Sequence, residues 1–331
     1  MKKALLTVLL FSCVSFAQDM EFHGYGAAGY RFMDRIRIVE SNQETYYEGK
    51  FQAEFKVNKH IEAQLDFRAN SDDQQAYLRE FSAKFSYIPW LKFEMGNIKR
   101  PFGSEYMESE ENLSAVRRSY LTEEAGELGY TGRSVGIMAY YKTKDVANFP
   151  HSYFLYVFKN NNVQNGVVAR YIHHFSHLST GVNYFLLNTG GDYPISTSAF
   201  AANVLYKKKD IEFETELMLM QDPIEAIRRK LQFLKDTNVW AWGARVSSAV
   251  GFDTGGSIIE EIEPLVLLSF YQPDAKTGGQ HTIQTLLGAN FYFDKDVRLR
   301  LNGDILLTKN EYSDDYSTHD SRFTLELQVR F

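Results

Sequence analysis

The sequence predicts an all-β protein: a transmembrane, antiparallel, up-and-down β-barrel of about 16 strands. Three observations predict it. Apolar and polar residues alternate with a period of two along most of the chain, and short connectors alternate with long ones. No stretch after residue 20 holds the roughly 18 consecutive apolar residues that a spanning helix needs. Disorder is excluded because the 25 Phe, 21 Tyr and 3 Trp residues could bury a large apolar surface.

The chain begins with a pattern typical of a secretory signal peptide. Two lysines precede an apolar stretch over residues 4–14, and residues 15–17 fit a cleavage site. We therefore expect residues 1–17 to be removed and residues 18–331 to form the barrel. Lipid attachment at Cys13 is an alternative, although the residues before it fit that motif badly. Cleavage after residue 17 would remove the only cysteine, so no disulfide is expected.

The alternation is clearest in three neighbouring segments, residues 47–57, 61–69 and 77–87, where apolar residues alternate with polar or charged ones. Such segments form strands with one apolar and one polar face, because successive side chains of a strand point to opposite sides. On this basis strands are expected near residues 22–32, 44–57, 60–70, 76–87, 90–98, 132–142, 151–158, 166–174, 177–187, 197–206, 211–221, 238–250, 257–271, 280–293, 296–308 and 320–331.

The connectors between these strands are sorted by length. Those after even-numbered strands are mostly short, such as residues 58–59 and 294–295, and those after odd-numbered strands are mostly long, such as 99–131 and 309–319. This sorting is typical of an outer-membrane barrel with short periplasmic turns and long extracellular loops. Lipid cannot satisfy a free strand edge, so we expect a closed sheet with apolar faces toward lipid and charged faces around a wet lumen.

The last nine residues alternate between apolar and polar side chains and end on Phe331. This segment resembles the terminal strand of bacterial outer-membrane proteins, whose final aromatic residue is the signal read by the barrel assembly machinery. The resemblance implies that role for Phe331. Aromatic residues near other strand ends, such as Tyr47, Tyr87 and Trp90, suit the girdles at a membrane interface.

The longest connector, residues 99–131, follows the fifth expected strand. The segment from Gly96 to Gly103 reads G-N-I-K-R-P-F-G, and Gly132-Arg133-Ser-Val-Gly136 follows the connector. Both segments resemble those of the phosphate-selective porin O and P family of bacterial outer-membrane porins. The first segment resembles that family's G-x-x-x-x-P-F-G pattern. The resemblance implies a third loop, residues 99–131, folded into the pore. It does not carry the family's phosphate selectivity, because no lysine and arginine ladder can be matched here.

The same resemblance implies a function and a location. It implies passive diffusion of small hydrophilic solutes and ions through the outer membrane of a Gram-negative bacterium. A homotrimer embedded in outer-membrane lipid is also implied, without a cofactor. The Gly- and Ala-rich segment at residues 24–29 would allow close packing against a neighbour or the inserted loop.

Charged residues of the loop and of the inward strand faces are the candidates for solute selection. The loop candidates are Arg100, Glu105, Glu108, Glu110, Glu111, Arg117 and Arg118, and the wall candidates are Lys50, Arg68, Lys84, Arg170, Arg298 and Arg300. Fixed charges around a narrow pore select ions, and we expect acidic loop residues to face basic wall residues. The alternative is a solvated loop whose surface ion pairs contribute little. The sign of the selectivity stays open, because the chain is acidic overall and the wall candidates are basic.

Two further segments stand out in the sequence. Residues 222–234 predict a short amphipathic helix that packs over the barrel mouth, with Asp222 as its cap. His173, His174 and His177 do not predict a metal site, because the first two point to opposite faces of a strand.

The sequence predicts no enzyme and no nucleic-acid partner. It contains no phosphate-binding glycine loop, no nucleophile elbow, no H-E-x-x-H motif and no basic stripe. Two other functions remain as alternatives: an outer-membrane hydrolase, and a structural or adhesive barrel with a plugged lumen. Both predict little conductance.

Overall fold

The computed structural model describes residues 19–34, 42–71, 74–160, 164–190, 194–234, 238–276, 279–309, 316–318 and 321–331. The expected signal peptide lies outside these residues. Within them, sixteen long strands form one antiparallel sheet: β1 Asp19–Asp34, β2 Asn42–Asn58, β3 Ile61–Asn70, β4 Gln75–Ile88, β5 Leu91–Lys99, β6 Arg133–Tyr141, β7 His151–Asn160, β8 Gln164–His174, β9 Leu178–Thr189, β10 Ile195–Lys208, β11 Ile211–Gln221, β12 Trp240–Val250, β14 Glu261–Gln272, β15 His281–Tyr292, β16 Val297–Lys309 and β18 Ser321–Arg330.

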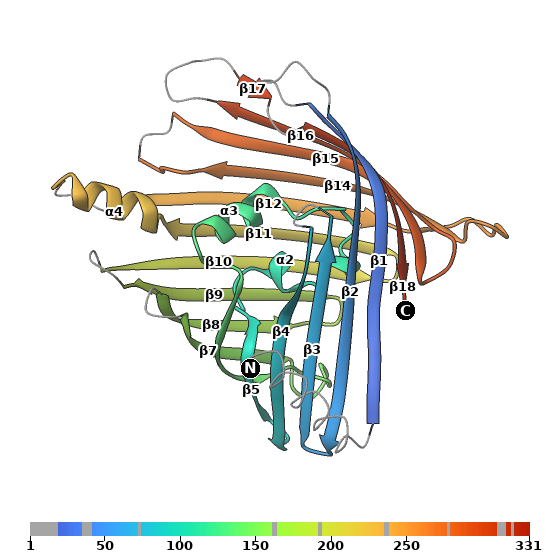
Figure 1. Cartoon of the computed structure of the whole chain (residues 1–331), viewed down its shortest axis with the longest axis horizontal. Helices are drawn as coiled ribbons and strands as arrows, with labels where there is room; N and C mark the ends of the chain where they lie inside the picture. Colours follow the sequence, from blue (N-terminus) through green and yellow to red (C-terminus); the bar gives the residue numbers. More distant parts are fainter. Residues whose placement is uncertain are drawn as a thin grey trace.

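The sheet closes into a barrel, as the sequence predicts. Each long strand pairs antiparallel with its neighbours in the chain, and β1 pairs with both β2 and β18 (Figure 1). Two short strands, β13 Phe252–Asp253 and β17 Tyr316–Thr318, extend the sheet at its rims. We call the rim with the connectors 59–60, 89–90, 175–177 and 209–210 the short-turn end, and the opposite rim the long-loop end.

The chain end completes the seam between β1 and β18. The backbone nitrogen of Gly24 donates to the Phe331 carbonyl (2.9 Å), and the Phe331 nitrogen donates to the Gly24 carbonyl (3.0 Å). A Cβ at Gly24 would lie 2.6 Å from the Phe331 ring and 2.3 Å from the Lys50 carbonyl oxygen. Only glycine therefore fits at this point of the seam without a shift of its neighbours.

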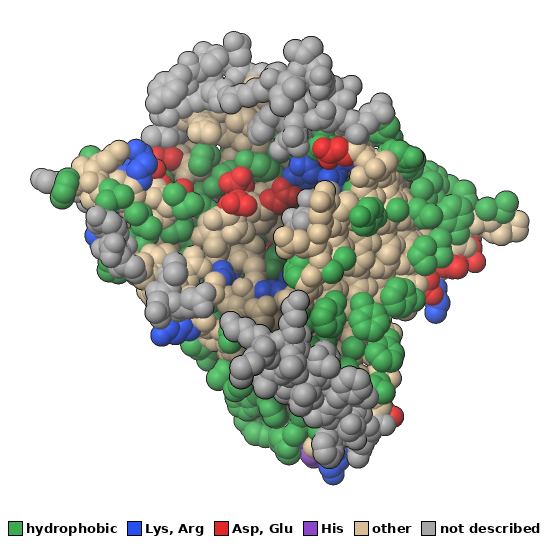
Figure 2. All heavy atoms as spheres, viewed as in Figure 1, with side chains coloured by type: hydrophobic (Ala, Val, Ile, Leu, Met, Phe, Trp, Pro, Cys, Tyr) green, Lys and Arg blue, Asp and Glu red, His purple; other side chains and the backbone are tan. Residues whose placement is uncertain are grey.

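The outer surface of the barrel is apolar. On β5, the side chains of Phe93 and Met95 are 40% and 50% exposed, whereas Glu94 between them is buried on the inner side. Figure 2 shows hydrophobic side chains over the outer surface, and acidic and basic side chains gathered in the hollow in the middle of the viewed face. The predicted direction of the apolar faces is confirmed on these strands.

The interior is not charged throughout, and this differs from the prediction. On β7, the inward side chains Phe154, Tyr156 and Phe158 are buried, while Leu155 and Val157 point outward. Both faces of this strand are apolar because its inner face packs against an inserted loop rather than against water. Charged inward side chains lie on β2–β5, on β11 and β12, and on β16 and β18.

Residues 100–132 form the inserted loop, which we call L3. It contains α2 Ser104–Met107, the 3₁₀ helix η1 Glu110–Asn112 and α3 Tyr120–Glu127. In Figure 1 these elements lie within the arc of strands. No helix among the described residues is long and apolar enough to cross a membrane.

The helix predicted at residues 222–234 is present as α4 Pro223–Leu231. The Asp222 carboxylate caps it by accepting from the backbone nitrogens of Ile224 (2.8 Å) and Glu225 (2.9 Å). The helix lies at the long-loop end against β10, and Lys230 donates to the Pro194 carbonyl oxygen (2.9 Å).

Candidate functional site

Two glycines shape the start of L3. Gly96 has φ 147° and Gly103 has φ 77°, backbone conformations that favour glycine. A Cβ at Gly96 would lie 2.0 Å from the Phe81 carbonyl oxygen on β4, so the strands approach too closely there for a side chain. Gly103 directly precedes α2 and turns the chain into the barrel. These are the first and last residues of the G-x-x-x-x-P-F-G segment.

Arg100 ties the two ends of L3 together. Its Nε and Nη2 donate to Ser134 Oγ at 2.9 and 2.7 Å, and its Nη1 donates to the carbonyl oxygens of Gly129 and Thr131. Its guanidinium also lies over the Phe158 ring, 4.5 Å from the centroid. Arg100 is buried at the neck of the loop and lines neither of the cavities described below.

A buried charge cluster on β11 and β12 holds α2. The Ser104 nitrogen donates to Glu216 Oε1 (2.6 Å), and Arg245 Nη2 donates to Ser104 Oγ (3.2 Å). Three carboxylates surround the Arg245 guanidinium, those of Glu214 (2.7 Å), Glu216 (3.1 Å) and Glu105 (3.8 Å). The start of L3 is thereby fixed to the wall by charge-assisted hydrogen bonds.

Glu105 joins α2 to α3. Its carboxylate accepts from the nitrogen of Ser119 (3.1 Å), from the Ser119 hydroxyl (2.5 Å) and from the Thr122 hydroxyl (2.5 Å). Burial would raise the pKa of Glu105, but Arg245, Arg118 and these hydroxyls outweigh it and hold the pKa below its usual value. The buried carboxylate is therefore charged, and both of its oxygens accept hydrogen bonds from residues of the loop.

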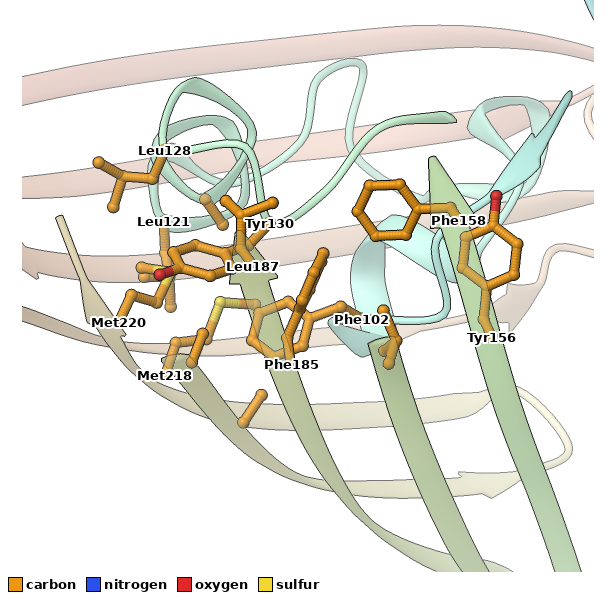
Figure 3. Packing of buried hydrophobic residues seen from close by; sticks show 14 of the residues in the cluster. Phe102, Leu121, Leu128, Tyr130, Tyr156, Phe158, Phe185, Leu187, Met218 and Met220 are labelled. Carbon is orange, nitrogen blue, oxygen red and sulfur yellow. The ribbon is translucent and has the colours of Figure 1, made fainter. Parts of the chain in front are cut away.

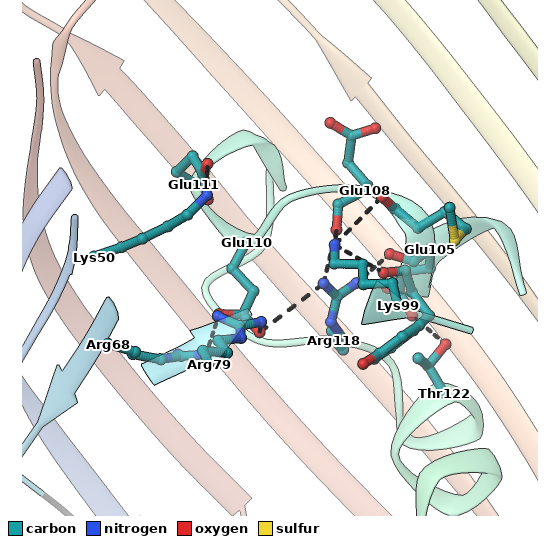
Figure 4. A network of polar contacts seen from close by, with 12 residues as sticks. Lys50, Arg68, Arg79, Lys99, Glu105, Glu108, Glu110, Glu111, Arg118 and Thr122 are labelled. Atoms are coloured by element: carbon teal, nitrogen blue, oxygen red, sulfur yellow. Dashed lines mark hydrogen bonds and ion pairs between the residues drawn. The ribbon is translucent and has the colours of Figure 1, made fainter. Parts of the chain in front are cut away.

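The η1 segment reaches the opposite wall (Figure 4). Glu110 accepts from both terminal nitrogens of Arg79 (3.2 and 3.1 Å) and pairs with Arg68, and Glu111 accepts from Lys50 (2.7 Å). Burial would raise the pKa of Glu110, but Arg79, Arg68 and Arg118 lower it to about 2. Acidic loop residues here face basic residues of β2, β3 and β4.

Two arginines of β16 hold the middle of L3 by its backbone. Arg298 Nη2 donates to the carbonyl oxygens of Glu111 (2.8 Å) and Leu113 (2.9 Å). Arg300 Nη1 donates to those of Leu113 (3.4 Å) and Ala115 (3.3 Å), while its other nitrogens pair with Glu326 on β18. These arginines are buried and stabilise the loop rather than facing open space.

The next part of L3 is fixed by side chains of β14–β16. The Tyr120 nitrogen donates to Gln284 Oε1 (2.6 Å), and the Leu121 nitrogen donates to Ser269 Oγ (3.2 Å). Arg117 pairs with Asp304 (3.1 Å). The first turn of α3 is therefore bound to the wall through its free backbone donors.

The return of L3 is apolar. Leu121, Leu128 and Tyr130 pack with Phe102 against inward side chains of β6–β12 and β14, of which Figure 3 labels Tyr156, Phe158, Phe185, Leu187, Met218 and Met220. The Tyr130 hydroxyl donates to the Gln221 carbonyl oxygen (2.7 Å). The long-loop half of this wall is thus filled by packed side chains, which explains the apolar inner face of β7.

Two cavities lined by described residues lie beside L3. The charged cavity, of about 420 Å³, is lined by charged side chains from β2–β6 and by Glu110 and Glu111. The mixed cavity, of about 310 Å³, is lined by α2, by residues 112–115 and by both apolar and charged side chains of β7–β14. Met107, Lys142 and Phe154 line both cavities, so they mark the boundary between them.

The residues predicted from the sequence divide into three groups. Lys50, Lys84, Glu110 and Glu111 line the charged cavity, and Glu105, Glu108 and Arg170 line the mixed cavity. The third group attaches L3. On the strands, Arg68, Arg298 and Arg300 bind carboxylate or carbonyl oxygens of L3. Within L3, Arg117 pairs with Asp304 of the wall and Arg118 donates to a carbonyl oxygen of the loop itself. Lys84 does not reach L3 and instead donates to Glu62 (3.1 Å) and Gln64 (2.7 Å).

Sequence reasoning missed several wall residues that hold L3, among them Arg79 and Arg245. Arg79 points inward beside Glu80 because the β3–β4 register shifts after Asp66, so that two consecutive residues reach the inner side. Arg245 lies on β12, where the alternation is weak. Glu212, Glu214 and Glu216 alternate along β11, and this pattern indicates an acidic inner face that could hold a buried basic residue such as Arg245.

The fold has close structural counterparts. No protein-family model matches the sequence, and no curated protein is similar to it in sequence. Similar solved structures include OmpF of Salmonella typhi in complex with daunomycin (15% identity, 96% of this chain and 99% of that chain, TM-score 0.63). The outer membrane channel DcaP of Acinetobacter baumannii gives 9% identity, 95% and 97% coverage, and a TM-score of 0.68.

An anion-selective porin from Comamonas acidovorans also matches, with 9% identity, 94% and 98% coverage, and a TM-score of 0.66. At such low identities the similarity establishes the fold alone. The chain has the closed antiparallel barrel of bacterial porins.

Proposed function

We propose that this protein is a porin that lets small hydrophilic solutes and ions diffuse passively across the outer membrane of a Gram-negative bacterium. The observation that carries the proposal is the pair of cavities beside an inward-folded loop, in a barrel whose outer face is apolar. Charged groups around a narrow water-filled passage act on ions and polar solutes without covalent chemistry. No cofactor is part of the proposal.

The proposal extends to the assembly of the protein. The resemblance of residues 96–103 and 132–136 to the phosphate-selective porin O and P family supports a homotrimer, and the basic residues 2–3 with the apolar stretch support export by a signal peptide. The pairing of Phe331 with Gly24 at the seam is compatible with a role of the last residue in barrel assembly. Phosphate selectivity is not proposed.

Recording from purified mature protein in planar lipid bilayers tests the proposal. We expect stepwise conductance increments that scale with the salt concentration. Deleting residues 109–117 should enlarge the increment, because this segment carries η1 across the lumen. A chain that inserts, migrates as a folded barrel and yet gives no increments would contradict the channel function.

A plugged structural or adhesive barrel is the second candidate. One observation favours it: L3 is bonded to wall residues of β2, β3, β4, β11, β12, β14, β15 and β16, and many of these residues are buried. This candidate predicts no conductance in the native protein and conductance after the deletion in L3. A hydrolase would instead cleave lipid or peptide without a conductance in either form.

A further inference from the structure

The mixed cavity differs in chemistry from the charged cavity beside it. Its wall combines apolar side chains of four strands with one residue of L3, Leu113. The strand residues are Phe154, Ile172, Leu205, Leu265 and Leu267. The apolar part of this wall favours a solute whose own apolar group is removed from water against it. A solute that uses this cavity should therefore carry an apolar body.

The charges of the same cavity favour a cation. The lining holds four carboxylates, those of Glu105, Glu108, Glu212 and Glu214, against the three basic side chains of Lys142, Arg170 and Arg245, so its formal charge is negative by one. Of these basic side chains, Arg170 donates to the Gly103 carbonyl oxygen (3.0 Å). Lys142 stands at the boundary with the charged cavity.

Glu108 supplies the contact for that cation. Its side chain is exposed in the mixed cavity, and among the described residues no hydrogen bond or ion pair engages its carboxylate. Lys99 and Arg118 bind only its backbone oxygen, at 3.1 and 2.8 Å. Figure 4 shows the Glu108 carboxylate pointing away from Lys99, Arg118 and Glu105.

We propose that the mixed cavity is a binding site for amphipathic organic cations, in which a primary ammonium pairs with Glu108 and an apolar body lies against the wall around Leu205 and Leu267. The inference rests on the proposed channel function, because the cavity is reached through the lumen. It adds a substrate class that the overall porin fold does not specify.

Phenethylammonium is the probe, because it joins one aromatic ring to one primary ammonium. Calorimetric titration of the detergent-solubilised protein should give saturable binding, and the probe should reduce single-channel current in bilayers. Methylammonium, which lacks the ring, and 3-phenylpropionate, which reverses the charge, should each bind at least tenfold more weakly. Equal binding of either would overturn the inference.

Two variants locate the site. Glu108→Gln removes the carboxylate without breaking an ion pair, and Leu205→Asn makes the wall polar; each should weaken phenethylammonium binding about tenfold or more. Glu94→Gln is the matched control, since it makes the same change in the charged cavity and should shift the dissociation constant less than twofold. Unchanged binding in Glu108→Gln would also overturn the inference.

The two proposals fail separately. A protein that binds phenethylammonium but never conducts would contradict the channel function and leave a binding site in a closed barrel. A protein that conducts without binding the probe would retain the channel function and exclude the cation site.

Discussion

The Glu105 carboxylate accepts hydrogen bonds from both the backbone nitrogen and the hydroxyl of Ser119, which lies 14 residues further along the chain. Ser119 is in turn the N-cap of α3, so one buried carboxylate fixes the start of that helix to α2. Glu105 also faces Arg245 on β12. The shape of L3 and its attachment to the wall thus depend on the same side chain.

Replacing Glu105 with glutamine should loosen L3. The amide keeps the volume but cannot accept all of these hydrogen bonds, and it leaves buried donors unsatisfied at a cost of about 1–3 kcal/mol. Urea unfolding followed by tryptophan fluorescence should show this loss, and open-channel current noise should rise. Glu127→Gln, an exposed change on the α3 helix whose N-cap Glu105 binds, is the control and should behave as wild type. Identical stability in both variants would contradict the role of Glu105.

The attachment of η1 should resist moderate acid. The pKa of Glu110 is about 2, lowered from 4.5 by Arg79 and Arg68 against the effect of burial. A carboxylate whose pKa is lower in the folded state adds stability that is fully present above about pH 4.5 and is lost as the pH falls through about 2. Pepsin should therefore cleave L3 slowly at pH 4 and faster near pH 2. In Glu110→Gln this particular pH response should be absent, and cleavage should already be faster at pH 4.

The lysines of the charged cavity should set part of its ion preference. Lys50 and Lys84 both line this cavity, and replacing them with alanine removes two positive charges while the carboxylates stay. The reversal potential in a salt gradient should then shift toward cation selectivity, because fixed charge sets the local ion concentration. Lys295→Ala, at a side chain 89% exposed on the short-turn end, is the control. A shift toward anion selectivity would contradict the assignment of the lining.

The two arginines at the centre of L3 offer a second test of selectivity. Arg117 and Arg118 bind Asp304 and the carbonyl oxygen of Glu108, respectively. Their joint replacement with alanine should raise the cation preference and also broaden the distribution of conductance levels, because L3 loses two attachments. Reversal potentials and conductance histograms that both match wild type would exclude these residues from the constriction.

Alanine at Gly24 should disturb closure of the barrel. Its Cβ would collide with the Lys50 carbonyl oxygen at 2.3 Å and with the Phe331 ring at 2.6 Å, and such overpacking costs about 1–3 kcal/mol. The fraction of protein that migrates as a folded barrel in unheated gels should fall. Gly26→Ala is a matched control two residues away, since nothing lies within 4 Å of its Cβ position. Equal folded fractions would show that the seam tolerates the change.

The barrel could be predicted because its determinants are local. Alternation along a strand such as β2 decides which side faces lipid, and the neighbouring short turns decide the pairing, so the strand order and the closure followed. The terminal strand was recognisable for the same reason. The helix α4 was also predictable, since Asp222, Pro223 and the apolar spacing lie within one short segment.

The interior of the barrel was harder to predict because it depends on contacts between distant residues. The inward position of Arg79 results from a register shift between β3 and β4 that cannot be recognised in the sequence pattern. The inner faces of β7 and β9 are apolar because Leu121 and Tyr130 of L3 pack against them, and the sequence does not show this packing. The sequence identified L3 and its charges but could not assign Arg298 and Arg300 to backbone carbonyls rather than to open space.

The bonds that hold L3 have a consequence for the order of assembly. L3 follows β5, yet Arg298 and Asn302 of β16 contact residues of L3 that lie more than 180 positions earlier in the chain. While the later strands are still being added, Val116 and the neighbouring backbone groups have no wall to bind. The proposed passage through the barrel would therefore acquire its final width only when β16 has joined the sheet, so that the last steps of folding would set its permeability.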